Sequence, residues 1–187
     1  PIKLTDMGDA QSKLGYAQNW ADFTLCEAFA QHFDNTVGNV GPIYVVNVLD
    51  PDVHKDAEKT TKTLTFKNNR TEFESSDIIL DTFAIADKAE GVDYSLGYNF
   101  TKGTVVVQLL KDLESDSLEC TYNTVDASAV ESDDIIGQET ADGQYTGLHA
   151  MSLLYQYHNA VLNILAAPGW SHIPEVYKAM VSTVQKL

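Results

Sequence analysis

Cysteine and basic residues are scarce in this chain of 187 residues, and it has no long apolar run. The two cysteines, Cys26 and Cys120, lie far apart and show no CxxC or Cys/His spacing. They predict buried free thiols in a reducing compartment and argue against a disulfide framework or a zinc site. The longest apolar stretches, such as Val161–Ala167, are far shorter than the roughly 20 residues that a membrane-spanning helix needs. No N-terminal segment has the pattern of a signal peptide. We therefore expect no membrane insertion.

The shortage of basic residues makes the chain strongly acidic. It has 27 Asp and Glu residues but 12 Lys and Arg residues, which gives a formal net charge of −15. Because an acidic surface repels phosphate groups, we expect neither nucleic acid nor an anionic membrane as a partner. The 44% share of hydrophobic residues is that of an ordinary globular protein. The length suits one or two domains.

The two ends of the chain combine helical periodicity with short apolar runs. The expected elements are helices at Asp9–Leu14 and Phe23–Phe33, a strand at Ile43–Leu49, a helix at Tyr145–His158, a strand at Val161–Ala166 and a helix that starts near Pro174. Near-continuous apolar strands are typical of parallel sheets, which are buried on both faces. Two such strands alone would leave open edges. We therefore expect the chain to be a fragment of a longer protein, and the alternative is that its central part lends strands.

The central part predicts many short strands separated by turn signals. They are expected at Thr60–Phe66, Phe73–Glu74, Ile78–Ala86, Tyr94–Phe100, Thr104–Leu110 and Leu118–Val125. Such spacing is typical of an antiparallel sandwich or a small barrel. The predicted fold is therefore α+β with two domains. Residues 1–55 and 132–187 form an α/β domain with parallel strands, and residues 56–131 form an inserted all-β domain.

Motifs that carry chemistry are missing. The five histidines, at positions 32, 54, 149, 158 and 172, show no metal-binding spacing. Asp112–Asp116 starts like a calcium loop, but Ser117 replaces the required glycine and Asn123 the bidentate glutamate. Phosphate-binding glycine loops and a GxSxG elbow are absent. Ser171 and His172 are neighbours without an identifiable third partner. We expect no catalytic, cofactor-binding or metal-binding residue, and we expect that the protein is not an enzyme.

Several short motifs, in the right order, resemble those of phage contractile-tail sheath proteins. They are the helix and turn Ala28–Asn35 before the strand Ile43–Val48, the hairpin that starts at Gly91–Leu96, the D-I-I-G element Asp134–Gly137 with Tyr145–Ala150 after it, and the strand Val161–Ala166 that closes in Ala167-Pro168-Gly169. Asn47 stands where the family often has arginine, and Trp170 where it has smaller residues. The resemblance covers most of the chain.

The resemblance implies a structural subunit of a phage or prophage tail, or of a related injection machine. Sheath subunits stack in helical rings around a tail tube and contract to drive it through the host envelope. The implied partners are other copies of the protein, the tail tube protein and the baseplate. The implied location is the virion tail, after assembly in the host bacterial cytoplasm. We expect this fragment to lack the family's terminal arms and C-terminal domain and to be monomeric in isolation.

Two other functions stay open from the residues alone. One is an α/β hydrolase or ligand-binding domain with its site near Asp50 and Gly169. The other is a β-sandwich module that binds glycans through exposed Tyr94, Tyr98 or Tyr122. In a sheath subunit, the inserted all-β domain could face outward, and its lysine-rich segment 55–70 could meet the acidic stretch Asp112–Asp142 of a neighbour. Alternatively, its lysines only guard an exposed strand edge against aggregation.

Overall fold

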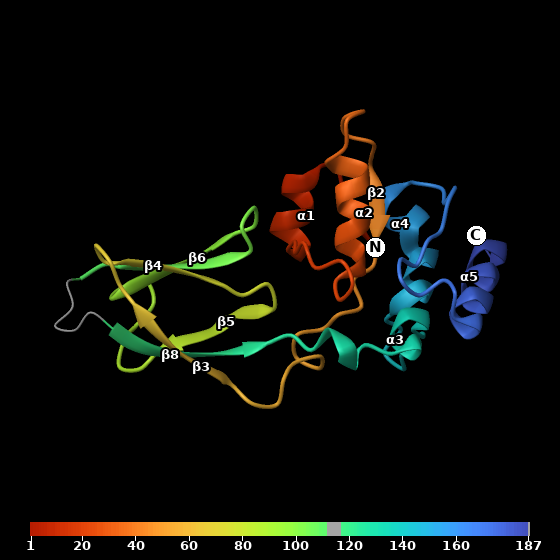
Figure 1. Cartoon of the computed structure of the whole chain (residues 1–187). Coiled ribbons are helices and arrows are strands. Elements are labelled where there is room, and N and C mark those ends of the chain that lie inside the picture. Colours follow the sequence, from red (N-terminus) through yellow and green to blue (C-terminus); the bar gives the residue numbers. More distant parts are fainter. Residues whose placement is uncertain (112–116, 187) are drawn as a thin grey trace. The chain divides into compact units, whose positions relative to one another are not determined.

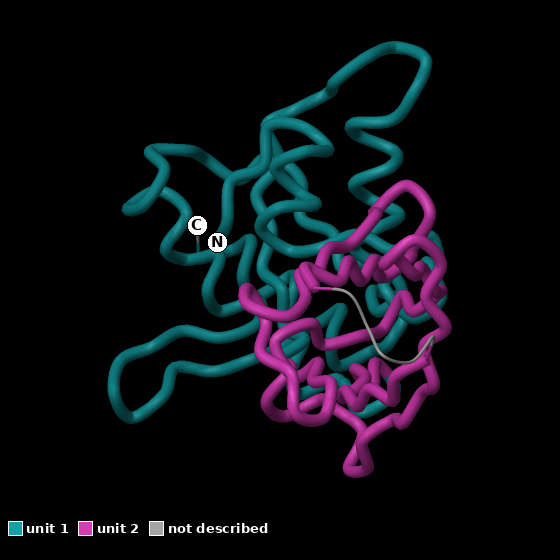
Figure 2. Tube along the Cα trace, turned by 90° about the vertical axis from the view of Figure 1, so that its left-hand side faces the viewer, with its two compact units in different colours: residues 1–50, 128–187 teal, residues 51–127 magenta. Residues whose placement is uncertain are grey.

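The computed structural model describes residues 1–111 and 117–186. Contacts divide the chain into two compact units. Unit 1 comprises residues 1–50 and 128–187, and unit 2 comprises residues 51–127 (Figure 2). Among the residues that the structure describes, no helix combines the length and apolar character needed to cross a membrane.

The N-terminal part of unit 1 combines two helices with a small sheet (Figure 1). Its elements are β1 (Ile2–Leu4), α1 (Met7–Leu14), α2 (Thr24–Phe33) and β2 (Ile43–Val45). Helix α1 begins at an Asp6 cap and ends at Gly15, which has a φ of 78°. Cys26, Phe29 and Phe33 of helix α2 pack in a core that also contains Leu4 and Val45. A fully buried Val, Leu or Phe side chain stabilises the fold by about 1.5–3 kcal/mol relative to an exposed one.

The C-terminal part of unit 1 is helical. It contains α3 (Ser132–Ile136), the 3₁₀ helix η2 (Gly147–Leu153), α4 (Leu154–His158) and α5 (Pro174–Lys186), and the 3₁₀ turn η1 (Ala127–Ala129) comes before them. Leu148, Ala167 and Val176 form a small buried cluster that connects η2 with α5. Helix α5 buries only Val176 completely. Most of its surface is therefore left uncovered by the rest of the unit.

Unit 2 is an antiparallel sandwich of two three-stranded sheets. The strands are β3 (Thr60–Thr65), β4 (Arg70–Glu74), β5 (Ile78–Ile85), β6 (Tyr94–Asn99), β7 (Thr104–Leu109) and β8 (Ser117–Thr124). One sheet has the order β3-β8-β5 and the other β4-β7-β6. Alternate residues of each strand face a shared core in which Leu64, Cys120 and Tyr122 of the first sheet meet Val105 and Val107 of the second.

Several sequence predictions agree with these elements. The α+β class is confirmed, since helices and antiparallel sheets are both present. The predicted hairpin is confirmed as β6 and β7, which pair from Tyr94 opposite Leu109 to Asn99 opposite Thr104. Its turn contains Gly103 with a φ of 65°, a conformation that favours glycine.

The prediction of parallel strands in the α/β part is wrong. Strand β2 is antiparallel to β1, and the pairing covers three residues on each side because β1 ends at Leu4. The predicted strand Val161–Ala166 has no regular structure. A buried strand needs neighbours that satisfy its backbone groups, and no strand of unit 1 in the described ranges pairs with this segment. The predicted helix Tyr145–His158 is divided into η2 and the short α4.

Candidate assembly surfaces

The positions proposed for a hydrolase or ligand site are surface or packing positions. Gly169 has a φ of 77°, and a Cβ atom there would lie 2.6 Å from Cγ2 of Thr24. The space beside this glycine is therefore filled by α2. Asp50 is exposed after β2. Ser171 and His172 are also exposed, and the Ser171 N–H donates to the carbonyl oxygen of Ala167 (3.0 Å) within a turn.

Two histidines make hydrogen bonds to backbone carbonyl oxygens. His32 Nδ1 donates to the carbonyl oxygen of Val40 (2.9 Å), and His158 Nε2 donates to that of Pro1 (2.9 Å). The centre of the His158 ring also lies 5.1 Å from that of Tyr44, so α4 contacts β2 and the residue directly before β1. Within residues 1–111 and 117–186, no group of three His, Cys, Asp or Glu side chains is placed to hold a metal ion. The acidic segment Asp112–Asp116 lies outside the described residues.

The tyrosines proposed for glycan binding belong to the sandwich core. Tyr94 is 2% exposed and Tyr122 is 4% exposed, and Tyr98 is partly buried. The rings of Tyr94 and Tyr122 both pack against Phe83, with centroid distances of 5.9 and 6.2 Å. Burial raises the pKa of both phenols above the ordinary value. The prediction that these rings are exposed is therefore wrong, and a glycan could not stack on them.

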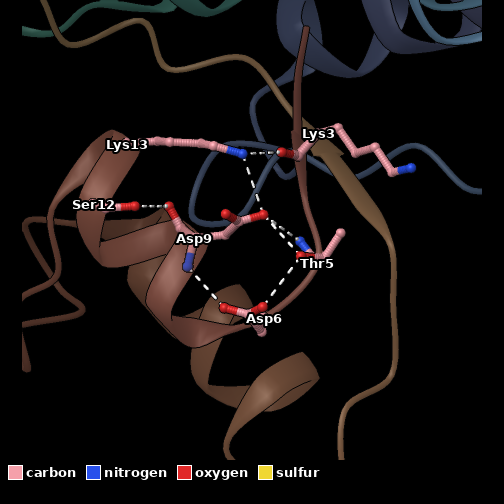
Figure 3. A network of polar contacts seen from close by, with 6 residues as sticks. All are labelled: Lys3, Thr5, Asp6, Asp9, Ser12 and Lys13. Atoms are coloured by element: carbon pink, nitrogen blue, oxygen red, sulfur yellow. Dashed lines mark hydrogen bonds and ion pairs between the residues drawn. The ribbon is translucent and has the colours of Figure 1, made fainter.

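A polar network fastens the first strand to the first helix (Figure 3). The Asp9 carboxylate accepts hydrogen bonds from the Thr5 hydroxyl (2.8 Å) and the Thr5 N–H (3.2 Å), and Lys13 Nζ lies 3.2 Å away. Lys13 also donates to the carbonyl oxygen of Lys3 in β1 (3.1 Å). The hydrogen bond from Thr5, together with Lys13, lowers the pKa of Asp9. Because Lys13 occupies a backbone acceptor of β1, this carbonyl is already satisfied within the chain.

The Asp9 network was missed in the sequence analysis, although the sequence contains a signal for part of it. Asp6 stands immediately before α1, and its carboxylate accepts the Asp9 N–H (2.8 Å). An aspartate directly before a helical segment is the pattern of an N-cap residue. The contact between Lys13 and Lys3 joins residues ten apart and has no such local signature.

The sandwich presents four strands with one unpaired side each in the part of the chain that the structure describes. These are the outer strands β3 and β5 of one sheet and β4 and β6 of the other. Strand β3 is exposed except at Leu64. Lys62 of β3 places its Nζ 5.2 Å from the centre of the Phe73 ring, which protects the rim of the core with a charged group. Such edges are where a second chain could add to the sheet.

Unit 1 exposes apolar side chains on two segments. Val161 is 71% exposed and Ile164 is 85% exposed in the irregular segment 161–166. On α5, Tyr177, Val181 and Val184 form an exposed stripe with the spacing of one helical face. A contiguous exposed apolar patch commonly marks a protein–protein contact, and the stripe on α5 is a candidate for one.

Two glycines of the motif region allow a close backbone crossing. Gly137 ends α3 with a φ of 67°, and a Cβ atom there would lie 2.1 Å from the carbonyl oxygen of Thr146. Gly147 begins η2, and a Cβ atom there would lie 2.6 Å from the carbonyl oxygen of Asp134. The hairpin between them is closed by the Thr146 N–H, which donates to the Gln138 carbonyl (3.0 Å). The D-I-I-G and Y-T-G-L motifs thus form one structural unit.

Comparison with known proteins gives one relevant similarity. The chain is 26% identical over 173 residues to a tail sheath protein of Burkholderia phage BcepMu. The aligned region covers 89% of this chain and 35% of the phage protein, so the chain spans about a third of its relative's length. No family model matches the chain, and no solved structure matches it. The similarity extends over residues of both units and supports a structural role in a phage tail sheath.

Proposed function

We propose that this chain is part of the structural subunit of a contractile phage or prophage tail sheath. The observation that carries the proposal is the similarity to a tail sheath protein over 89% of the chain. The short motifs that resemble those of sheath proteins, two of which form the Gly137–Gly147 crossing, agree with this similarity. The sandwich edges and the exposed apolar segments of unit 1 are features that a polymerising subunit can use for contacts.

In the proposed role, copies of the subunit polymerise in helical rings around a tail tube, above a baseplate. Contraction of the rings drives the tube through the host envelope. A shift between two lattices requires rigid bodies that move relative to neighbouring copies. We propose the two compact units as two domains of this kind, with residues of unit 2 inserted between the two parts of unit 1. Assembly takes place in the host cytoplasm, and the final location is the virion tail.

Immunogold electron microscopy on tail particles tests this proposal directly. Antibodies raised against the 187-residue chain are applied to phage or prophage particles released from cells that carry the gene. We expect gold along the whole length of extended tails, and along the shorter, wider sheath after contraction. Antibody that has been absorbed with the purified chain is the control. Labelling of capsids, fibres or no particle at all would contradict the sheath function.

A further inference from the structure

The basic residues of this acidic chain are concentrated in one segment of unit 2. Residues 55–70 contain five of the 12 basic residues and two acidic ones. The basic residues are Lys55, Lys59, Lys62, Lys67 and Arg70, and all five are exposed. Lys55 and Lys59 come before the outer strand β3, and Lys62 lies on it. Lys67 lies in the turn after β3, and Arg70 is the first residue of β4. We call this segment the basic edge.

The charge of the basic edge is only partly neutralised within the chain. Lys55 lies 3.9 Å from a carboxylate oxygen of Asp52, and Arg70 lies 3.7 Å from one of Glu72. Lys59 and Lys67 have no ion pair in the described ranges. Strand β3 hydrogen-bonds to β8 and to no other strand among the described residues, so nothing there covers its outer side.

Unit 1 has a surface of opposite charge. Between residues 128 and 177, all of which belong to unit 1, the sequence contains no Lys or Arg. Exposed carboxylates stand on α3 and on the hairpin that follows it, and they belong to Glu131, Asp133, Glu139 and Asp142. We call these four residues the acidic surface. Asp134 is not one of them, because it is only partly exposed, unlike Glu131, with which it forms the capping box of α3.

We propose that the basic edge of one copy docks on the acidic surface of the next copy. The two surfaces differ from each other, so the contact is heterologous and continues from copy to copy, as an open helical polymer requires. Complementary charge fixes the register of such a contact and steers the encounter. Edge protection alone explains Lys62 beside Phe73, but it does not explain why unit 1 has a long region without a compensating cation. The inference rests on the proposed sheath function, since it names the neighbour as another copy.

The contact is measured by nuclear magnetic resonance on the full ¹⁵N-labelled chain. At low salt, dilution from about 1 mM to about 0.05 mM should shift amide signals of β3 and of α3 together, as expected for a weak contact with a millimolar Kd. At about 0.3 M salt the Debye length is shorter than 8 Å, and the Kd should rise at least about tenfold. Signals that do not move on dilution would show that the copies do not contact each other and would overturn the proposal.

Charge reversal supplies the specific test. One variant carries Lys59→Glu and Lys67→Glu, and a second carries Asp133→Lys and Asp142→Lys. Each alone should lose the concentration-dependent shifts, because its two surfaces then carry charge of the same sign. An equal mixture of the two should regain them, because the intact basic edge of the second variant meets the intact acidic surface of the first, and the two reversed surfaces also complement each other. The control carries Lys88→Glu and Lys178→Glu, exposed positions outside the basic edge that change the net charge by the same amount as the first variant. It should behave like the natural chain.

Three results would overturn the inference. They are no concentration-dependent shift at low salt, equal loss in the control variant, and failure of the mixture to regain the shifts. Immunogold labelling of tails does not depend on this contact. Labelled tails together with any of these results would support the sheath function and contradict the proposed contact of the basic edge. Unlabelled tails together with recovery of the shifts in the mixture would support the contact between copies and contradict the sheath function.

Discussion

Gly137 and Gly147 lie where two stretches of backbone in unit 1 approach too closely for a side chain. A Cβ atom on Gly137 would lie 2.1 Å from a carbonyl oxygen, so the backbone itself would have to move. We expect Gly137→Ala to lower the free energy of unfolding of unit 1 by about 3 kcal/mol, through displaced backbone and the strain of a positive φ. Denaturant titration followed by tryptophan fluorescence measures the effect, because Trp20 and Trp170 both belong to unit 1.

Gly143 provides a matched control for this substitution. It has a similar φ of 74°, but no atom lies within 4 Å of the position that a Cβ would take. Gly143→Ala should therefore cost only the strain of the positive φ, about 1 kcal/mol. Equal losses for the two variants would show that the close crossing contributes nothing beyond its backbone conformation.

Glu72 makes the stability of unit 2 depend on pH. The Thr104 hydroxyl donates to Glu72 Oε1 (2.6 Å), and this hydrogen bond, together with Lys102, lowers the pKa of Glu72 below its ordinary value of 4.5. The contribution of the ionised carboxylate is complete above the ordinary value and is lost as the pH falls through the lowered one. We expect Glu72→Gln to flatten the decrease in melting temperature between about pH 5 and about pH 3. Thermal melts at several pH values, followed by the circular dichroism signal of the β strands, measure this change in melting temperature.

Glu74 is the comparison for the acid effect. It lies in the same strand, is exposed, and has no ion pair in the ranges that the structure describes. Glu74→Gln removes the same charge without removing the Thr104 contact. If both variants flatten the curve equally, the effect comes from net charge and not from the hydrogen bond of Glu72.

At the scale of single elements, segment 161–166 is where the sequence pattern and the structure disagree most. Its apolar residues predict a buried strand, but Val161 and Ile164 are exposed and the segment pairs with no strand in the described part. We expect its amide hydrogens to exchange almost as fast as those of an unfolded peptide, whereas those of β7 exchange slowly. Hydrogen exchange followed by mass spectrometry measures this. Slow exchange throughout 161–166 would show that the predicted strand forms after all.

Local pattern explains which elements could be predicted. The strands of unit 2 alternate between core and solvent and are separated by turn residues such as Gly103, so both signals lie within a few residues. The parallel sheet could not be predicted correctly, because an apolar run such as Ile43–Leu49 does not specify its partner or its direction. The pairing of β2 with β1 depends on residues more than 35 positions apart.

The same limit applies to the candidate surfaces. The sequence showed Tyr94 and Tyr122 as aromatic residues of a β region, but their burial depends on how two sheets face each other. The sequence contains the motifs with Gly137 and Gly147, but only the structure shows that the backbone passes too close to both positions for a side chain. By contrast, the clustering of lysines in residues 55–70 is a property of the sequence, and the structure adds that they lie before, on and just after the outer strand β3.

At the scale of the whole molecule, the two units offer a test of their independence as domains. The incoming and outgoing segments of unit 2 are joined to each other. The Asp56 N–H donates to the Thr124 carbonyl (2.9 Å), the Asp126 N–H donates to the His54 carbonyl (3.1 Å), and the Thr124 hydroxyl donates to the Asp56 carboxylate. These hydrogen bonds join the segment that enters unit 2 to the segment that leaves it. Unit 2 therefore needs no other part of the chain to hold its two ends together.

We therefore expect a polypeptide of residues 51–127 to fold by itself, with the β-type circular dichroism and cooperative melting of unit 2 in the full chain. Leu64→Ala is the matched variant, since Leu64 is 2% exposed in the sandwich core. It should cost about 2–5 kcal/mol, equally in the excised unit and in the full chain. An unfolded excised unit, or a Leu64→Ala loss that also shifts the tryptophan signal of unit 1, would mean that the two units fold as one cooperative body. A sheath subunit of that kind could not move its two units as separate rigid bodies during contraction.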